Sequence, residues 1–534
     1  MFRMEQANLL QIRLRAPHTG SDAQWAETFK ALSGNRGACD EVWFSTGILF
    51  PEMGWHEEHA ARLSRYAAEL RAAGIAPSLQ VQATLGHGDS FGGSAEMMAG
   101  RTWRGFTGPT GVECKSCNCP RQPGFLAYVG EMSRVYAAAI RPEWVWIDDD
   151  LRVGNHVPAV SGGDFGCWCD GCISAFNAET GGSWSRGGLA AAISENKEVR
   201  RRWEAFSYAS IAGVARAIAG AVHAVSPESR FGYQLCGWPN DSQLAVFAAL
   251  REEGCGNDVG ARPGGGAYFD LDPANPVKKA LAAARQRRIL GDPAWISAWL
   301  PEIETFPRAF ASRTARGIML EALASLAYGM NGLSALIMDT RAETDAWYSE
   351  NILAPLAAER GTLGRYRDAC AGTSPCGLGV PADLPIDGVF HYALAGIPVV
   401  PGPGAELGQM AREAAATDVR QLSTGDISRL RAEADARSGG RIPALAEDPT
   451  VGLIVPRVDA GGILRTVMIL NARIEPQKPV RLRLRNVAEG ATSAIWRAFG
   501  EEPARLPLLR SGTGTALELP RLGAWNAGWL EFGL

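Results

Sequence analysis

The sequence predicts an α/β protein in which a (β/α)8 TIM barrel is followed by a small α/β domain and a C-terminal β-sandwich. Three observations support this prediction. Over the first two thirds of the chain, eight short apolar runs alternate with helical patterns, as in a barrel. After that, Gly and Pro become frequent, and from residue 452 strand-like runs are separated by Gly- and Pro-rich turns. We therefore expect domains at residues 1–372, 373–447 and 448–534.

The barrel prediction depends on eight strands with helices between them. We expect the strands at 9–16, 41–48, 78–85, 144–147, 230–238, 257–269, 294–300 and 332–339. We expect helices at 23–33, 55–74, 122–140, 187–225, 275–289, 308–329 and 345–370. An open doubly wound sheet is the alternative. Its dinucleotide-binding version is disfavoured because no Gly-x-Gly-x-x-Gly motif opens the first helix.

Composition limits the class of protein and its partners. Of the 534 residues, 46% are apolar and 21% are charged, and the net charge is −4. This balance is typical of a soluble globular protein and gives no sign of nucleic-acid binding. The first residues do not resemble a signal peptide, and no run approaches about 20 uninterrupted apolar residues. We therefore expect a cytoplasmic protein with no nucleic-acid or membrane partner.

Acidic residues follow two of the predicted strands. Asp148, Asp149 and Asp150 come directly after the fourth strand, and Glu302 and Glu304 follow the seventh. In a TIM barrel the C-terminal strand ends carry the chemistry, so these carboxylates are expected to face one pocket. Glycosidic bond cleavage uses such a pair: one acid protonates the leaving oxygen, and the other attacks or supports the anomeric carbon.

Other polar and aromatic residues are expected around these acids. The glycine-rich stretch GARPGGGAYFD, residues 260–270, permits close backbone approach to the pocket. Tryptophans provide flat apolar surfaces on which sugar rings can stack. Five of them are candidates for this role: Trp43, Trp103, Trp146, Trp238 and Trp299. The predicted substrate-binding residues are Asp148, Asp149, His156, Trp238, Arg262, Tyr268 and Trp299. The alternative is that the acids cap helices or bind surface cations and that the tryptophans belong to the core.

Six of the eleven cysteines form two clusters, one after the third strand and one after the fourth. Thiolates two or three residues apart can share one tetrahedral zinc, and four of them complete a closed structural site. Free buried thiols or a disulfide are the alternatives. If one zinc is bound, at least two of the six candidates are left over: Cys114, Cys117, Cys119, Cys167, Cys169 and Cys172.

These motifs together resemble the family 42 β-galactosidases, which are zinc-containing TIM-barrel glycosidases. The resemblance rests on the acidic end of strand four, on CWCDGCISAFNAETG at 167–181, and on RTARGIMLEALASLAYGMNG at 313–332. It implies a shortened amidotransferase-like middle domain and subunit contacts in a possible homo-oligomer. It also implies Asp150 as the acid/base, Asp149 as a ligand of sugar hydroxyls, and Glu302 or Glu304 as the nucleophile. The family has Asn-Glu where this chain has Asp149 and Asp150.

The sequence therefore predicts a glycoside hydrolase of retaining type that acts on a small oligosaccharide or glycoside. Asp150 would stay protonated because the neighbouring aspartates repel a further negative charge. Two alternatives remain. One is a barrel that binds sugar without turnover; the other is a metal-assisted hydrolase or lyase with Asp148, Asp149 and Asp150 as ligands of Mg²⁺ or Ca²⁺.

Overall fold

The chain is described from a computed structural model. The described residues are 9–86, 98–152, 160, 166–237, 239, 241–255, 259–266, 268–305, 312–338, 346–381, 386–402, 423–448, 452–511 and 514–533. Parts of several loops that follow the barrel strands fall outside these ranges.

The first half of the chain builds a parallel sheet in the order β10-β11-β1-β2-β3-β6-β7-β8-β9. Its strands are β1 (Leu10–Arg13), β2 (Glu41–Ser45), β3 (Ala76–Val81), β6 (Trp144–Ile147), β7 (Arg230–Gln234), β8 (Val259–Arg262), β9 (Ile296–Trp299), β10 (Glu302–Glu304) and β11 (Leu333–Leu336). All eight predicted strands are present, with the seventh split into β9 and β10.

The split strand closes the barrel. β9 pairs with β8 and β10 pairs with β11. Pro301 interrupts the strand because it has no amide hydrogen to donate. The ladder nevertheless continues past it: the amide of Leu300 donates to the Ala261 carbonyl at 2.9 Å, and the amide of Ser334 donates to the Pro301 carbonyl at 3.2 Å. The TIM-barrel prediction is confirmed.

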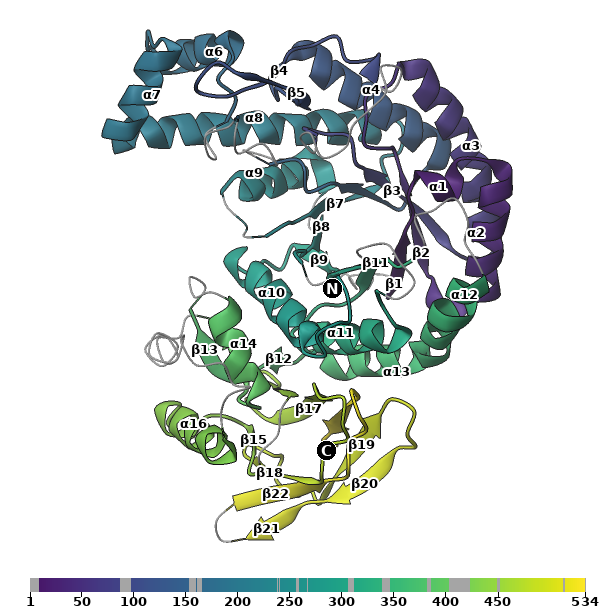
Figure 1. Ribbon diagram of the computed structural model, residues 1–534, viewed down its shortest axis with the longest axis vertical. Helices are drawn as coiled ribbons and strands as arrows, with labels where there is room; N and C mark the ends of the chain where they lie inside the picture. The colour runs from purple at the N-terminus through teal and green to yellow at the C-terminus, as the bar shows by residue number, and fades with distance from the viewer. Residues whose placement is uncertain are drawn as a thin grey trace.

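Helices surround this barrel (Figure 1). They are α1 (Ala16–Thr19), α2 (Asp22–Gly34), α3 (Met53–Ala72), α4 (Pro123–Ile140), α6 (Asp170–Thr180), α7 (Arg186–Glu195), α8 (Lys197–His223), α9 (Asp241–Leu250), α10 (Asn275–Ile289), α11 (Ala315–Ala327), α12 (Ala346–Tyr348) and α13 (Ala354–Cys370). The predicted helix 187–225 is two helices, because Asn196 caps α8 by accepting from the amides of Glu198 and Val199. α9 is not among the predicted helices.

Tryptophans fill the middle of the barrel. Trp43, Trp144 and Trp146 form a buried cluster there with Ala298 and Leu300. The rings of Trp43 and Trp146 stack with centroids 4.4 Å apart. The glycines of the neighbouring strands β7 and β8 leave room for these rings, since a Cβ on either would lie within 2.5 Å of Trp146. Trp43 and Trp146 are therefore core residues and provide no surface for a sugar.

A lobe beside the barrel contains the β4–β5 hairpin (Gly105–Thr107 and Glu113–Asn118), which the sequence reading missed. Figure 1 shows it with α6 and α7 near one end of α8. One helix of the described chain, α8, is long and apolar enough to cross a membrane, but 56% of the relevant window is buried inside the protein. That burial is typical of a core helix, and α8 packs against α4 and α9.

The remaining chain forms a short α/β segment and two antiparallel sheets. The α/β segment contains β12 (Ser374–Pro375), β13 (Leu378–Val380), α14 (Ile386–Leu394), β14 (Val399–Pro401), α16 (Thr424–Arg437) and β15 (Ala444–Ala446). The antiparallel strands are β16 (Gly452–Val458), β17 (Leu464–Asn471), β18 (Val480–Leu484), β19 (Ser493–Ala498), β20 (Ala504–Pro507), β21 (Leu509–Ser511), β22 (Gly514–Leu519) and β23 (Ala527–Glu531). β12 pairs with β16, and β15 pairs with β18. The α/β segment and the C-terminal strands therefore share sheets. The division into three domains stays a prediction.

Candidate active site

Polar side chains replace the tryptophans at the C-terminal end of the barrel. These side chains come from five strands, not all of them neighbours, and they contact one another across the barrel interior. They are Arg13 on β1, Gln80 on β3, Gln234 on β7, Arg262 on β8 and Glu302 on β10. Arg13 Nη1 and Gln80 Nε2 each lie 3.5 Å from Gln234 Oε1, and Arg13 Nη2 lies 3.5 Å from Glu302 Oε1. All of them are buried, as is Arg262 on β8. Buried charged groups need partners, so this set forms one connected network.

Glu302 lies at the centre of this network. Its carboxylate is 2.6 Å from Arg262 Nη1, and it accepts hydrogen bonds from the Tyr268 hydroxyl at 2.8 Å and from the Gly265 amide at 3.2 Å. Burial alone would raise the pKa of Glu302, but the positive charges of Arg262, Arg13 and Lys279 outweigh burial and lower that pKa to about 2. Glu302 is therefore ionised at neutral pH.

Asp149 is held by the same arginine as Glu302. Arg262 Nη2 lies 3.0 Å from Asp149 Oδ2, while Nη1 contacts Glu302. The side chain of Asp149 is 15% exposed, against 5% for Glu302. Burial, and then the negative charge of Asp148, raise the pKa of Asp149, although Arg262 opposes the shift. Two carboxylates with opposite pKa shifts thus flank one guanidinium group.

The other two aspartates have different partners. Asp148 accepts from Gln80 Nε2 at 2.6 Å. Asp150 is fully buried and accepts from the Gly86 amide at 2.6 Å and from the Thr84 hydroxyl, both just beyond β3. The chain turns at residues 149–150, so the strict alternation of a strand no longer determines where these side chains lie. The assignment of Asp150 as acid stays a prediction, and the geometry favours Asp149.

Glu304 lies close to Glu302. Arg13 Nη2 is 3.5 Å from Glu302 and 3.4 Å from Glu304, and Arg15 Nη2 is 3.3 Å from Glu304. Both glutamates therefore face the same side of the strand, as expected from their spacing. Glu302 is the one that contacts Arg262, and through it Asp149.

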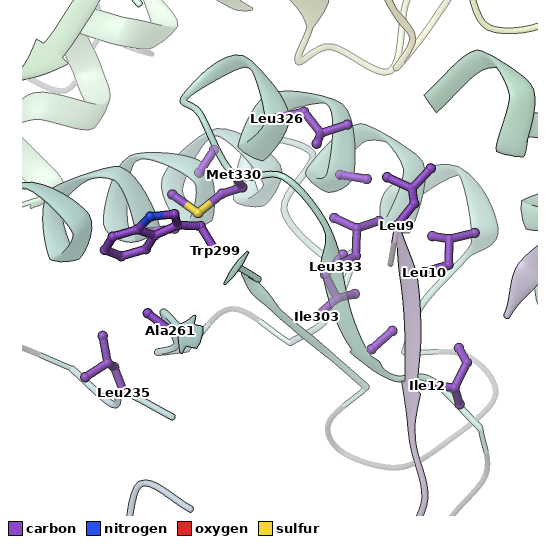
Figure 2. Packing of buried hydrophobic residues seen from close by; sticks show 14 of the residues in the cluster. Leu9, Leu10, Ile12, Leu235, Ala261, Trp299, Ile303, Leu326, Met330 and Leu333 are labelled. Atoms are coloured by element: carbon purple, nitrogen blue, oxygen red, sulfur yellow. The ribbon is translucent and has the colours of Figure 1, made fainter. Parts of the chain in front are cut away.

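The other predicted substrate-binding residues separate into three groups. Arg262 and Tyr268 contact Glu302, as described above. His156 and Trp238 lie outside the described residues. Trp299 is 3% exposed and belongs to the core between strands and helices, where Figure 2 shows it beside Met330. It faces away from the barrel interior because its neighbour Ala298 points inward, and this position does not favour the predicted contact with substrate.

Sequence reasoning missed Arg13, Gln80 and Gln234. A signal was available, since each is a polar residue that alternates with apolar ones along a predicted strand: LQIRLR, SLQVQ and RFGYQL. Strand side chains alternate between faces, so a polar residue at an inward position near the strand's C-terminal end belongs to the pocket. Using this signal requires the register of each strand, which the sequence alone did not determine.

Four of the six candidate cysteines come together. The sulfurs of Cys119, Cys167, Cys169 and Cys172 all lie within 4.8 Å of one another, and all four residues are buried. Cys119 Sγ is 3.7 Å from Cys169 Sγ and 3.4 Å from Cys172 Sγ. Sulfurs about 2.3 Å from a central zinc have tetrahedral edges of roughly 3.8 Å. The four thiols therefore fit a metal ion of that coordination.

Cys114 and Cys117 are the two candidates left over. Cys117 Sγ lies 3.7 Å from the Gly86 carbonyl, and Cys114 Sγ lies 3.5 Å from Ser116 Oγ. Both lie on the β4–β5 hairpin but outside the four-cysteine cluster. They are the two candidates that a single four-coordinate metal would leave over.

Comparison with known proteins supports the fold of the chain. No protein-family model matches the sequence, and no curated protein matches it. Solved structures do match nearly end to end. A cold-adapted β-galactosidase from Rahnella sp. R3 aligns at a TM-score of 0.58 and 11% identity, covering 97% of this chain and 99% of that one.

Two more β-galactosidases give the same picture. A catalytic mutant of a GH42 enzyme from G. stearothermophilus aligns at a TM-score of 0.60 and 9% identity, over 99% of both chains. The enzyme from the psychrophilic Marinomonas ef1 aligns at 0.57 and 10% identity, over 98% of this chain and 100% of that one. At such low identity the likeness establishes the fold alone. The chain thus has, over almost its whole length, the fold of the family 42 β-galactosidases.

Proposed function

We propose that the protein is a glycoside hydrolase that cleaves a small oligosaccharide or glycoside with retention of configuration. The observation that carries the proposal is the pair Asp149 and Glu302, which come from different strand ends and share Arg262. Their pKa shifts have opposite signs, as a nucleophile and a general acid require. The β-galactosidase fold supports the same class of reaction.

Glu302 would attack the anomeric carbon as the ionised carboxylate. Tyr268 and the Gly265 amide would orient it through their hydrogen bonds. Asp149 would donate its proton to the leaving oxygen and then take a proton from the water that hydrolyses the glycosyl ester. Retaining enzymes separate the two carboxyl groups by about 5–5.5 Å, and a single guanidinium group between them is compatible with such a short separation.

The two alternatives are less well supported. The aspartates 148–150 engage three different partners, namely Gln80, Arg262 and the Gly86 amide, so their oxygens do not converge as ligands of one hard cation would. A sugar-binding barrel without turnover would not need an ionised buried glutamate opposite an acid of raised pKa.

The test is to trap the covalent intermediate. A 2-deoxy-2-fluoro glycoside with a dinitrophenolate leaving group should form a stable ester, which peptide mass spectrometry would locate on Glu302. Glu302→Gln should remain folded, acquire no label and lose turnover. A label on Glu304 would assign Glu304, and not Glu302, as the nucleophile. Turnover without any trapped ester, or with inversion by NMR, would refute the retaining mechanism.

We further propose that the four clustered cysteines hold a structural zinc ion. All four ligands would be thiolates, which leaves no open position for water, so the ion would stabilise the lobe and take no part in the reaction. The ten cysteines among the described residues that are free of disulfides fit a reducing compartment, and we propose the cytoplasm.

A further inference from the structure

A cavity lies at the opposite end of the barrel from Glu302. It has a volume of about 650 Å³, within the range of small-molecule sites. Gly329, Met330 and Asn331, which precede β11, form part of its wall, so it lies at the N-terminal ends of the strands. The C-terminal ends of α10 and α13 and the segments around β12, β13 and β14 close it. Figure 1 shows this region where α10 meets α14 and β13.

Arginines dominate this cavity. Five of them line it, and Asp292 is the one carboxylate among the described lining residues. Asp292 pairs with Arg287 at 2.7 Å. Arg367 also lies 3.6 Å from Asp368, whose side chain is 66% exposed and does not line the cavity. The lining therefore has a clear excess of positive charge: Arg287, Arg288, Arg367, Arg441 and Arg457.

Arg457 shows that part of this charge is built into the fold. It lies on β16, is 3% exposed, and donates to the Ala327 carbonyl at 2.5 Å and the Cys370 carbonyl at 3.2 Å. These carbonyls end α11 and α13, where a cation is favoured by the helix dipoles. Arg457 thus joins the terminal sheets to the barrel and fixes one wall. Arg288, Arg367 and Arg441 are less buried than Arg457 and also line the cavity.

We propose that this cavity binds a small molecule that carries a phosphoryl group. Guanidinium groups match phosphate oxygens in geometry and charge, and several of them around one space favour a multiply charged anion. Tyr328, Met330, Val400 and Pro401 also line the cavity and give an apolar surface for the rest of the ligand. The site is separate from the carboxylate pair and does not depend on the glycosidase proposal.

The experiment uses the full chain and inorganic phosphate as the probe. Calorimetric titration should give saturable binding, and phosphate should raise the melting temperature above that in chloride at equal ionic strength. Arg441→Gln and Arg367→Gln should each weaken phosphate binding about tenfold or more, the loss expected for one hydrogen bond between charged groups. Circular dichroism would confirm that both variants fold.

Arg505→Gln is the matched control, because Arg505 is exposed on β20 and does not line the cavity. It should bind phosphate like the unmodified protein. Absence of saturable binding would overturn the proposal. So would binding that Arg441→Gln and Arg367→Gln leave unchanged, since the phosphate would then bind elsewhere. Equal binding of acetate and phosphate would show that the site takes anions without preference for a phosphoryl group.

Discussion

Replacing Asp149 by Asn tests the assignment of the general acid. The substitution keeps the size of the side chain and removes the proton that the acid would donate. Burial and Asp148 raise the pKa of Asp149, so the protonated form persists to higher pH than for an ordinary aspartate. Activity should therefore be lost as pH rises through the pKa of Asp149, and Asp149→Asn should lose that basic limb.

The size of the effect depends on the leaving group. General acid catalysis contributes roughly 10²- to 10⁴-fold, which corresponds to about 3–5 kcal/mol of transition-state stabilisation. Asp149→Asn should lose this factor in kcat/KM on phenyl glycosides, whose leaving group needs a proton. It should lose much less on dinitrophenyl glycosides, which leave unaided. The phenyl and dinitrophenyl β-galactosides are the first pair of substrates to compare. Added azide should restore turnover of the dinitrophenyl substrate by Asp149→Asn, because azide can attack the glycosyl ester in place of water without a general base.

Asp150→Asn is the matched control for this experiment. Asp150 accepts a 2.6 Å hydrogen bond from the Gly86 amide in a fully buried position. Disturbing the hydrogen bonds of a buried polar group costs about 1–3 kcal/mol of stability. The variant should therefore melt earlier but keep the leaving-group dependence of the unmodified enzyme. If Asp150→Asn alone loses the phenyl substrate while folded, and Asp149→Asn does not, Asp150 is the acid and our reading of the geometry is wrong.

Three further predictions concern the metal, the pH dependence of stability and the barrel core. The purified protein should contain one zinc per chain by mass spectrometry; Cys119→Ser should lose it and Cys114→Ser should keep it. Burial lowers the pKa of His56 from 6.5 to about 3, so the stability it provides is present above pH 6.5 and is lost on acidification. Urea unfolding should show a loss of about 1.4 kcal/mol per pH unit from this one group between these pKa values, and His56→Asn should remove that contribution. Gly232→Ala should cost about 1–3 kcal/mol or more, because its Cβ would lie 2.2 Å from a tryptophan ring, whereas Gly213→Ala on α8, where nothing lies within 4 Å, should be neutral or stabilising in the same assay.

Local patterns in the sequence were enough to predict much of the barrel. Each strand is a short apolar run bounded by turn residues, and this pattern can be recognised from residues adjacent in the sequence. The β4–β5 hairpin and α9 were missed, as was the break at Asn196. The hairpin contains the polar and cysteine-rich stretch ECKSCN, which has little of the apolar alternation that marks a strand.

The sequence also indicated which chemical groups would meet, because the C-terminal ends of parallel strands in a barrel share one face. That rule brought the acids after strands four and seven, together with Arg262 and Tyr268, to one pocket. It could not say which of three consecutive aspartates faces Glu302. That choice depends on how the chain turns after β6 and on which donors the adjacent strand offers, here the Gly86 amide for Asp150 and Arg262 for Asp149.

What the sequence determined by itself is therefore the order of elements and the residue types at each strand end, since both follow from local composition and periodicity. Only the tertiary structure decided which four of six cysteines converge, that Trp299 lies under the helices, and that arginines from distant segments line a cavity at the other end of the barrel. Each of these depends on the relative positions of residues far apart in the chain, and those positions are set by strand register and packing.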